Sequence, residues 1–448
     1  RYSPASARRR ERRPPPRRRR IAVTTVDPAP GSRERAAPGA RRVLAYFARL
    51  RSFSPNARLY LAGTFLMGLG HGAVWVHMNL YYRALGLGEA SIGRILSAGA
   101  LGNVLVAIPA ALWIDRFPAG RIFSIAAAGY AALLTVMLLV SSPGLLTACS
   151  LAVGMLFTIH WVAAAPFFMR NAGEKERLYL FGFASAAETL ATIIAALSVG
   201  ALARWLAPMV ASEAASLRYP LLGVAAASLL AVLFFSRIQS PPPQGGRRSV
   251  REYLMARDWG LLGRLTVPSF LVGMGAGLII PFLNLYFRDR FGQDPRQIGW
   301  FYAVSQMLTM LGFLAGAPLA RRLGSVRAVV LTELLSIPFF LVLALTRNLA
   351  LAVAAFWIRG ALMNMNHPVS TNFAMEVVTP DQQTVTNSVR MLAWNISWMV
   401  SAQLGGWVIE RHGYTPPMFI TICLYAVSAA LFYGFFRNRL DVGRSGRG

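Results

Sequence analysis

The side chains best suited to chemistry in this chain are ionisable groups that lie inside long apolar stretches. Glu188 lies about 16 Å along its predicted helix, at about 1.5 Å per residue, so it is near the middle of the stretch. Arg359 lies equally deep in another stretch. Either group costs about 2.5–3.5 kcal/mol to place in lipid, so we expect both to face a protein interior or a water-filled cavity. Glu188 could exchange a proton or bind a cation, whereas Arg359 could bind an anion or pair with Glu188.

Neutral polar side chains accompany these two groups. Imidazoles titrate near neutral pH and are therefore alternative proton carriers. Each neutral side chain could equally be an interhelical hydrogen-bonding group, worth about 0.6 kcal/mol. The candidate residues for substrate binding and coupling are Glu188, Arg359, His71, His77, Asn79, His160, Asn284, Asn366, His367 and Trp394.

The sequence offers no motif for covalent or metal-assisted chemistry. It contains no serine–histidine–carboxylate set, phosphate-binding loop or His/Cys cluster with metal-ligand spacing. Cys149 and Cys423 both lie in apolar stretches, where small packing residues are expected. We therefore expect no enzyme, no metal and no cofactor, with a proton gradient as the energy source.

The composition indicates a membrane protein. Hydrophobic residues make up 55% of the chain and charged residues only 14%, whereas soluble proteins approach a quarter charged. Apolar stretches of about 20 residues can each cross about 30 Å of hydrocarbon, where only helices satisfy the backbone. The sequence predicts an all-α integral membrane protein with twelve transmembrane helices at 58–82, 91–114, 121–141, 144–168, 178–203, 216–236, 265–287, 297–320, 327–346, 349–372, 385–409 and 416–436.

A sequence repeat divides these helices into two halves. Gly68, Gly70, Gly72, Asn79, Leu80, Tyr81 and Arg83 recur 205 positions later as Gly273, Gly275, Gly277, Asn284, Leu285, Tyr286 and Arg288. With one residue of slippage, Ile92-Gly93 recurs as Ile298-Gly299. Transporters built from repeats place their substrate pathway at the interface between the repeats, so the same arrangement is expected here.

The loop after the second predicted span resembles the signature of the major facilitator superfamily (MFS), Gly-x-Leu-Ala-Asp-Arg-x-Gly-Arg-Arg. Asp115, Arg116 and Arg121 match it, while Ala111 replaces the first glycine and the second is displaced to Gly120. The corresponding turn of the second half keeps Gly324 and basic residues but has Arg321 in place of the aspartate. The resemblance implies the MFS fold of two pseudo-symmetric six-helix halves. It also implies that helices 1, 4, 7 and 10 line a cavity, and that helices 2, 5, 8 and 11 form the interface.

The same resemblance implies a conformational clasp at the helix ends next to these two loops. A carboxylate there can accept paired hydrogen bonds from an arginine of the other half and so hold an outward-open state. The alternative is a surface ion pair worth less than about 1 kcal/mol. The clasp candidates are Asp115, Arg116, Arg121, Arg321 and Arg327.

Charge and composition predict the topology and the domain boundaries. Loops on the side of the termini carry 24 Lys and Arg, against 9 in the opposite loops, which predicts cytoplasmic termini. Arginine replaces lysine everywhere except at Lys175, a bias typical of GC-rich bacteria, so a bacterial inner membrane is expected. The predicted segments are a disordered Arg/Pro-rich tail at 1–57, the N-terminal half at 58–236, a cytoplasmic linker at 237–264, the C-terminal half at 265–436 and a cytoplasmic tail at 437–448.

These features favour a secondary active transporter that moves a small molecule by alternating access. Proton-coupled efflux, as drug or metabolite antiport, is the leading hypothesis. A proton-coupled importer of sugar or organic acid is the first alternative, with Arg359 pairing with an anionic substrate. The second is a membrane sensor or scaffold without transport. The expected partners are a small-molecule substrate and the lipid bilayer, with a monomeric chain. The arginine-rich tail could bind nucleic acid or anionic lipid, but we favour a solvated tail and expect no nucleic acid.

Overall fold

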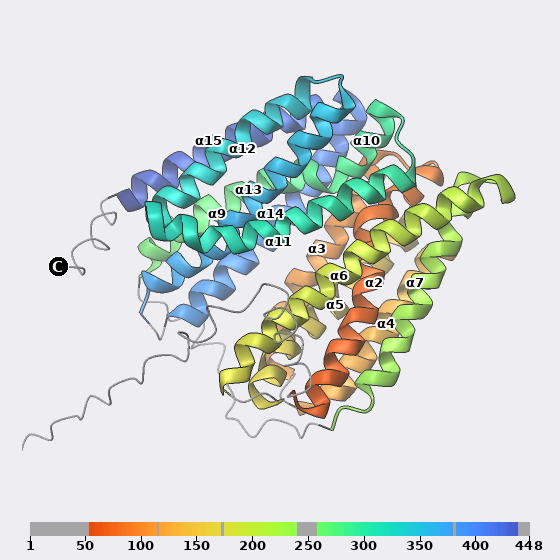
Figure 1. Ribbon diagram of the computed structural model, residues 1–448, viewed down its shortest axis with the longest axis horizontal. Coiled ribbons are helices and arrows are strands. Elements are labelled where there is room, and N and C mark those ends of the chain that lie inside the picture. Colours follow the sequence, from red (N-terminus) through yellow and green to blue (C-terminus); the bar gives the residue numbers. More distant parts are fainter. Residues whose placement is uncertain (1–52, 114–115, 172–173, 240–257, 380–381, 438–448) are drawn as a thin grey trace, which may run out of the picture. The chain divides into compact units, whose positions relative to one another are not determined.

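The computed structural model describes residues 53–113, 116–171, 174–239, 258–379 and 382–437, and within these ranges the regular secondary structure is helical (Figure 1). The predicted tails at 1–57 and 437–448 lie almost wholly outside the described residues, as does most of the linker at 237–264. Two six-helix halves remain, joined by that linker.

The N-terminal half runs from α2 to α7. Its long helices are α2 (Pro55–Ala84), α3 (Glu89–Trp113), α4 (Ala119–Leu139), α5 (Pro143–Asn171), α6 (Glu174–Leu206) and α7 (Glu213–Phe235). A 3₁₀ turn, η4 (Ala207–Met209), follows α6. All six predicted spans of this half are present.

The C-terminal half runs from α9 to α15. Its helices are α9 (Trp259–Ile279), α10 (Leu283–Phe291), α11 (Pro295–Leu323), α12 (Ser325–Leu345), α13 (Leu349–Glu376), α14 (Gln383–His412) and α15 (Thr415–Phe436). The 3₁₀ turn η5 (Ile280–Phe282) joins α9 to α10, and the three together form one membrane span. The described residues therefore contain the twelve predicted spans.

Ten of these spans are long and apolar enough to cross a membrane by length and composition alone. The two remaining spans are α11 and α14. The helix α11 packs against α6, and α14 packs against α3, so both helices contact the other half. Because part of their surface is covered by protein, they need not be apolar all round. Helices 2, 5, 8 and 11 of the bundle thus form the interface that the resemblance implies.

Local sequence signals fix where several helices begin. Asp294 and Gln297 form a capping box at the start of α11, each side chain bonding the other's backbone N–H. The side chains of Ser212 and Asn348 each accept one hydrogen bond from a backbone N–H in the first turn of α7 and α13. Gly292, at φ 64°, ends α10 in the left-handed conformation that glycine tolerates best. These caps lie at the end of the bundle opposite the first and last described residues, Phe53 and Arg437, and we call it the far end.

Candidate functional site

A pocket of about 80 Å³ lies inside the N-terminal half, between α2, α5 and α6. Its walls are mostly apolar and aromatic, with a few polar groups. Glu188 is the one carboxylate among the described residues that line it. The lining residues are Tyr60, Thr64, Met67, Gly68, His71, His160, Trp161, Ala164, Ala165, Phe168, Phe181, Ala184, Ser185 and Glu188.

The carboxylate of Glu188 has no hydrogen bond or ion pair with any described residue. The hydroxyl of Thr192, one turn away, donates to the backbone oxygen of Glu188 at 3.0 Å and so does not contact the carboxylate. Thr189 likewise donates to the backbone oxygen of Ser185. The hydroxyls of Thr189 and Thr192 are therefore satisfied within the helix, and the acid remains available to a ligand.

Two of the predicted histidines lie in the same pocket. The His71 ring packs edge-on between Tyr130 and Phe157, with centroids 4.6 Å from each, and its buried Nε2 atom has no hydrogen-bond partner. His160 places Nε2 3.4 Å from the Tyr60 hydroxyl. The fold thus brings Glu188, His71 and His160 together from three helices.

Three other candidates lie nearer the far end, outside this pocket. His77 is fully buried, and its Nε2 atom lies 3.0 Å from the Ala196 carbonyl oxygen of α6. Asn79 donates from Nδ2 to the Pro281 carbonyl oxygen at 2.7 Å, and Asn284 donates to that of Val76 at 2.8 Å. All three side chains make buried interhelical contacts, and the two asparagines join the halves to each other.

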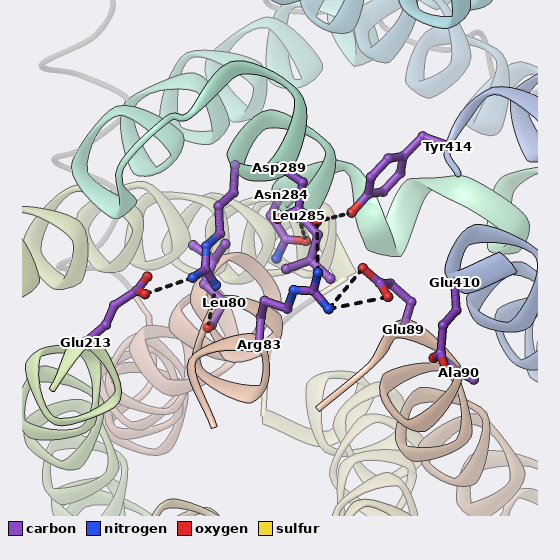
Figure 2. A network of polar contacts seen from close by, with 11 residues as sticks. Leu80, Arg83, Glu89, Ala90, Glu213, Asn284, Leu285, Asp289, Glu410 and Tyr414 are labelled. Carbon is purple, nitrogen blue, oxygen red and sulfur yellow. Dashed lines mark hydrogen bonds and ion pairs between the residues drawn. The ribbon is translucent and has the colours of Figure 1, made fainter. Parts of the chain in front are cut away.

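Charged side chains lie around Asn284 at the far end (Figure 2). Arg83 lies 3.4 Å from the Glu89 carboxylate and 4.0 Å from that of Asp289 in the other half. Its repeat counterpart Arg288 forms a 2.8 Å ion pair with Glu213. Both arginines of the sequence repeat therefore connect one half to a carboxylate of the other.

Two further carboxylates connect the halves at the far end. The Glu410 side chain accepts a 2.7 Å hydrogen bond from the backbone N–H of Ala90, in the first turn of α3 (Figure 2). Arg204 lies 3.6 Å from Asp294. Because a helix N-terminus has free N–H groups and a positive dipole end, Glu410 is well placed to cap α3 from the opposite half.

Arg359 lies in a different environment from the one that the sequence suggested. Its side chain is 4% exposed and its guanidinium lies 5.0 Å over the ring of Phe340. Tyr302 and Tyr425 are close enough to interact with it electrostatically. These neighbours belong to the C-terminal half, so Arg359 is packed within that half and does not pair with Glu188.

The remaining C-terminal candidates lie on α13 and α14. Asn366 is buried and donates to the Val329 carbonyl oxygen at 3.5 Å, whereas His367 is exposed. Trp394 lies beside Trp398, with ring centroids 6.0 Å apart. Asn366 thus has an interhelical contact, while His367 and Trp394 remain accessible to a ligand.

Sequence reasoning missed an aromatic contact between the halves. Trp75 of α2 lies one turn from His71, and its ring centroid is 6.4 Å from that of Trp398. Trp75 is 45% exposed despite its place in the middle of a long helix. The spacing of Trp75 from His71 indicated a shared face of α2, but the contact with α14 required the tertiary structure.

The described clasp candidates lie at the end of the bundle opposite the far end. The side chains of Arg116, Arg121, Arg321 and Arg327 are exposed, and none of them is in an ion pair with a described residue. Asp115 lies outside the described residues. The ion pairs between the halves that we find are those of the far end.

Two similar six-helix halves, apolar spans and a mostly apolar pocket that contains one carboxylate are the features of a multi-pass membrane transporter. The family model of the Major Facilitator Superfamily matches residues 60–268 and 265–446, so the chain belongs to this superfamily. It is accordingly a membrane transporter of a small molecule and not an enzyme. No curated protein matches the chain in sequence.

Solved structures of several transporters share the fold. A bacterial homologue of the human lysosomal transporter Spinster, in an inward-facing and occupied conformation, has a TM-score of 0.71 at 17% identity, covering 87% of this chain and 97% of its own. The nucleoside transporter NupG has a TM-score of 0.69 at 17% identity, and the match covers 85% of this chain and 98% of NupG. A D-xylose–proton symporter gives 0.68 at 12% identity, covering 85% and 97%. At these identities the similarity establishes the fold alone.

Proposed function

We propose that this transporter is a proton-coupled exporter, in which Glu188 binds the proton and the substrate in turn. The observation that carries the proposal is the unpartnered carboxylate in a pocket of mostly apolar walls. A partly buried acid with no protein partner is more stable when neutral, and becomes available to a cationic or hydrogen-bond-donating group when it ionises. A substrate and a proton that compete for the same oxygen atoms give the simplest antiport cycle.

The pocket contains two further groups that could carry a proton in this cycle. His71, His160 and Tyr60 line it together with Glu188. A neutral imidazole can accept a proton from a carboxylic acid or donate to a carboxylate, depending on its tautomer. We assign Glu188 the coupling role and the histidines the role of orienting or relaying its proton.

We further propose that the end carrying the termini faces the cytoplasm of a bacterial inner membrane. The loops at that end carry 24 basic residues and the opposite loops carry 9, and this difference supports the orientation. The far end, where Asn79, Asn284 and the ion pairs connect the halves, would then face outward and be closed. A closed outer end leaves the pocket accessible from the cytoplasm, where an exporter collects its substrate.

Transport in proteoliposomes tests the coupling residue. The probe is the aromatic cation ethidium, driven by a pH gradient of either sign, with wild type, Glu188→Gln and Glu333→Gln. Glu333 is the matched control because it is a buried carboxylate, 2% exposed, in the other half. We expect Glu188→Gln to lower gradient-driven transport at least about tenfold, equivalent to about 1.4 kcal/mol, and Glu333→Gln to retain it.

The same assay gives the direction of coupling. Exchange of ethidium against protons supports antiport, whereas co-movement with protons supports the importer alternative. Gradient-driven transport by Glu188→Gln at the wild-type rate, with unchanged pH dependence, would rule out Glu188 as the coupling residue. The histidines of the pocket would then be tested next.

A further inference from the structure

Arg390 connects three helices of the C-terminal half. It lies on α14, and its Nη2 atom donates to the hydroxyl oxygens of Ser370 on α13 at 3.0 Å and Ser269 on α9 at 3.3 Å. The guanidinium is therefore held in a fixed position by two neutral acceptors. Fixed orientation is what a binding arginine needs, because its planar fork must meet its ligand in one plane.

The positive charge of Arg390 is not neutralised by any described residue. No carboxylate among those residues forms an ion pair with it, and its buried Nε atom has no hydrogen-bond partner. His367 of α13, which is exposed, lies within electrostatic range. Since a guanidinium stays protonated and has five N–H donors, an acceptor with two anionic oxygens would satisfy it best.

Arg359, the other arginine of this half at this depth, also has no ion pair with a described residue, and its buried Nε and Nη1 atoms have no hydrogen-bond partner. Arg359 differs from Arg390 in exposure, because it is only 4% exposed and its guanidinium is covered by the ring of Phe340. Arg390 is only partly buried and lies beside exposed polar groups. The anion-binding role that the sequence suggested for Arg359 is therefore better placed at Arg390.

The stripe of α14 that begins at Arg390 reaches the N-terminal half at its other end, at Trp398. Arg390, Trp394 and Trp398 follow one another at intervals of four residues, so they lie on one helical stripe. Trp398 contacts Trp75 of α2, which places the end of the stripe against the opposite half. A flat apolar group can pack on the two indoles of this stripe while an acidic group reaches Arg390.

We propose that Arg390 is the centre of an anion subsite, and that the transported molecule carries a carboxylate or phosphate next to a flat apolar body. The proposal rests on the proposed function in treating the pocket and this stripe as parts of one substrate pathway. With a cationic or donor group at Glu188, the substrate is then amphoteric. Ser269, Ser370 and His367 position the guanidinium, and Trp394 and Trp398 bind the apolar body.

Binding to the purified protein in lipid nanodiscs tests this assignment without transport. Quenching of tryptophan fluorescence is titrated with 2-naphthoate and with its neutral analogue 2-naphthamide at pH 7. The variants are Arg390→Gln, Arg390→Lys and the control Arg237→Gln, which alters an exposed arginine beyond the end of α7. Far-UV circular dichroism and thermal unfolding verify that each variant is folded.

We expect the wild type and Arg237→Gln to bind the acid at least about tenfold more tightly than the amide. Arg390→Gln should lose this preference because its affinity for the acid falls while its affinity for the amide does not. Arg390→Lys should keep part of the preference, because lysine retains the positive charge but lacks the planar set of N–H donors. Equal affinity of the wild type for acid and amide, absence of binding by both, or an unchanged preference in Arg390→Gln would each overturn the proposal. Glu188→Gln separates the two hypotheses, because it should abolish proton coupling and leave the acid preference intact.

Discussion

Asn79 and Asn284 make the same hydrogen bond in opposite directions across the two halves. Each side-chain amide donates to a carbonyl oxygen of the other half, Asn79 to Pro281 and Asn284 to Val76. Pro281 stands 205 positions after Val76, the same offset that separates the two asparagines. The pair is therefore related by the internal pseudo-symmetry, as equivalent contacts are in a twofold dimer.

Replacing either asparagine with leucine should favour opening of the far end. Each substitution removes one buried hydrogen bond and leaves a carbonyl oxygen unpaired. We expect the closed state to lose about 1 kcal/mol of stability, which raises the ratio of open to closed molecules about fivefold. Spin labels at Ala211→Cys and Arg296→Cys, in a chain without its native cysteines, report the separation across that end. The double variant should show about the sum of the two effects.

Asn395→Leu is the matched control for these two variants. The Asn395 amide donates to the Met391 carbonyl oxygen within its own helix and does not cross between the halves. Its far-end distances should be those of the wild type. A wild-type distance distribution in both Asn79→Leu and Asn284→Leu would show that the reciprocal bonds do not hold this end closed.

The ion pairs of the far end should differ in strength according to their exposure. Arg83→Gln leaves the Glu89 carboxylate, with a side chain only 8% exposed, without its partner, so we expect a loss of about 1–3 kcal/mol. Arg204→Gln breaks a pair whose arginine is 63% exposed, and the loss should be below about 1 kcal/mol. Thermal unfolding in the same detergent compares the two. Equal losses of stability in the two variants would mean that the burial of an ion pair does not determine its contribution.

Gly299→Ala should weaken the contact between α11 and α6. A methyl group at Gly299 would overlap with the Ala196 carbonyl oxygen, a backbone atom that cannot rotate away. We expect a destabilisation of about 1–3 kcal/mol from this overpacking. Gly223→Ala is the control, because a methyl group there meets no atom within 4 Å and alanine favours the helix. A higher unfolding temperature for Gly299→Ala would contradict the packing.

Asp115→Asn should act in the opposite direction to the asparagine variants. If the carboxylate holds the alternative, outward-open state, its loss should increase the fraction of molecules with a closed far end. The spin labels at positions 211 and 296 measure that fraction, and Asp27→Asn in the N-terminal segment is the control. An unchanged distribution in Asp115→Asn would leave the clasp without support.

The sequence was sufficient to predict the twelve spans and the two halves, because apolar length and a repeat with a constant offset are both properties of the chain itself. Helix ends were less predictable. The span expected at 265–287 runs from Trp259 to Phe291 and breaks at Ile280–Phe282. The caps at Asp258 and Gly292 were the signals for those ends, and Pro281 was the signal for the break.

The candidate site was predictable only where the spacing along one helix decided the question. The depth of Glu188 along its predicted helix indicated this residue, which the structure places in a pocket with His71 and His160. Spacing gives the face of a helix but not the neighbour that covers it. For that reason it did not reveal that aromatic side chains enclose Arg359, or that Trp75 meets Trp398.

The break at Ile280–Phe282 makes the two reciprocal bonds mechanically unequal. Val76 lies within the uninterrupted helix α2, whereas Pro281 lies in a 3₁₀ turn between two separate helical segments. Such a turn can act as a hinge, whereas an unbroken helix moves as one rigid element. We therefore expect the short segment α10 to swing first when the far end opens, with α2 following as part of a rigid body. A symmetric pair of bonds would then be released in a fixed order.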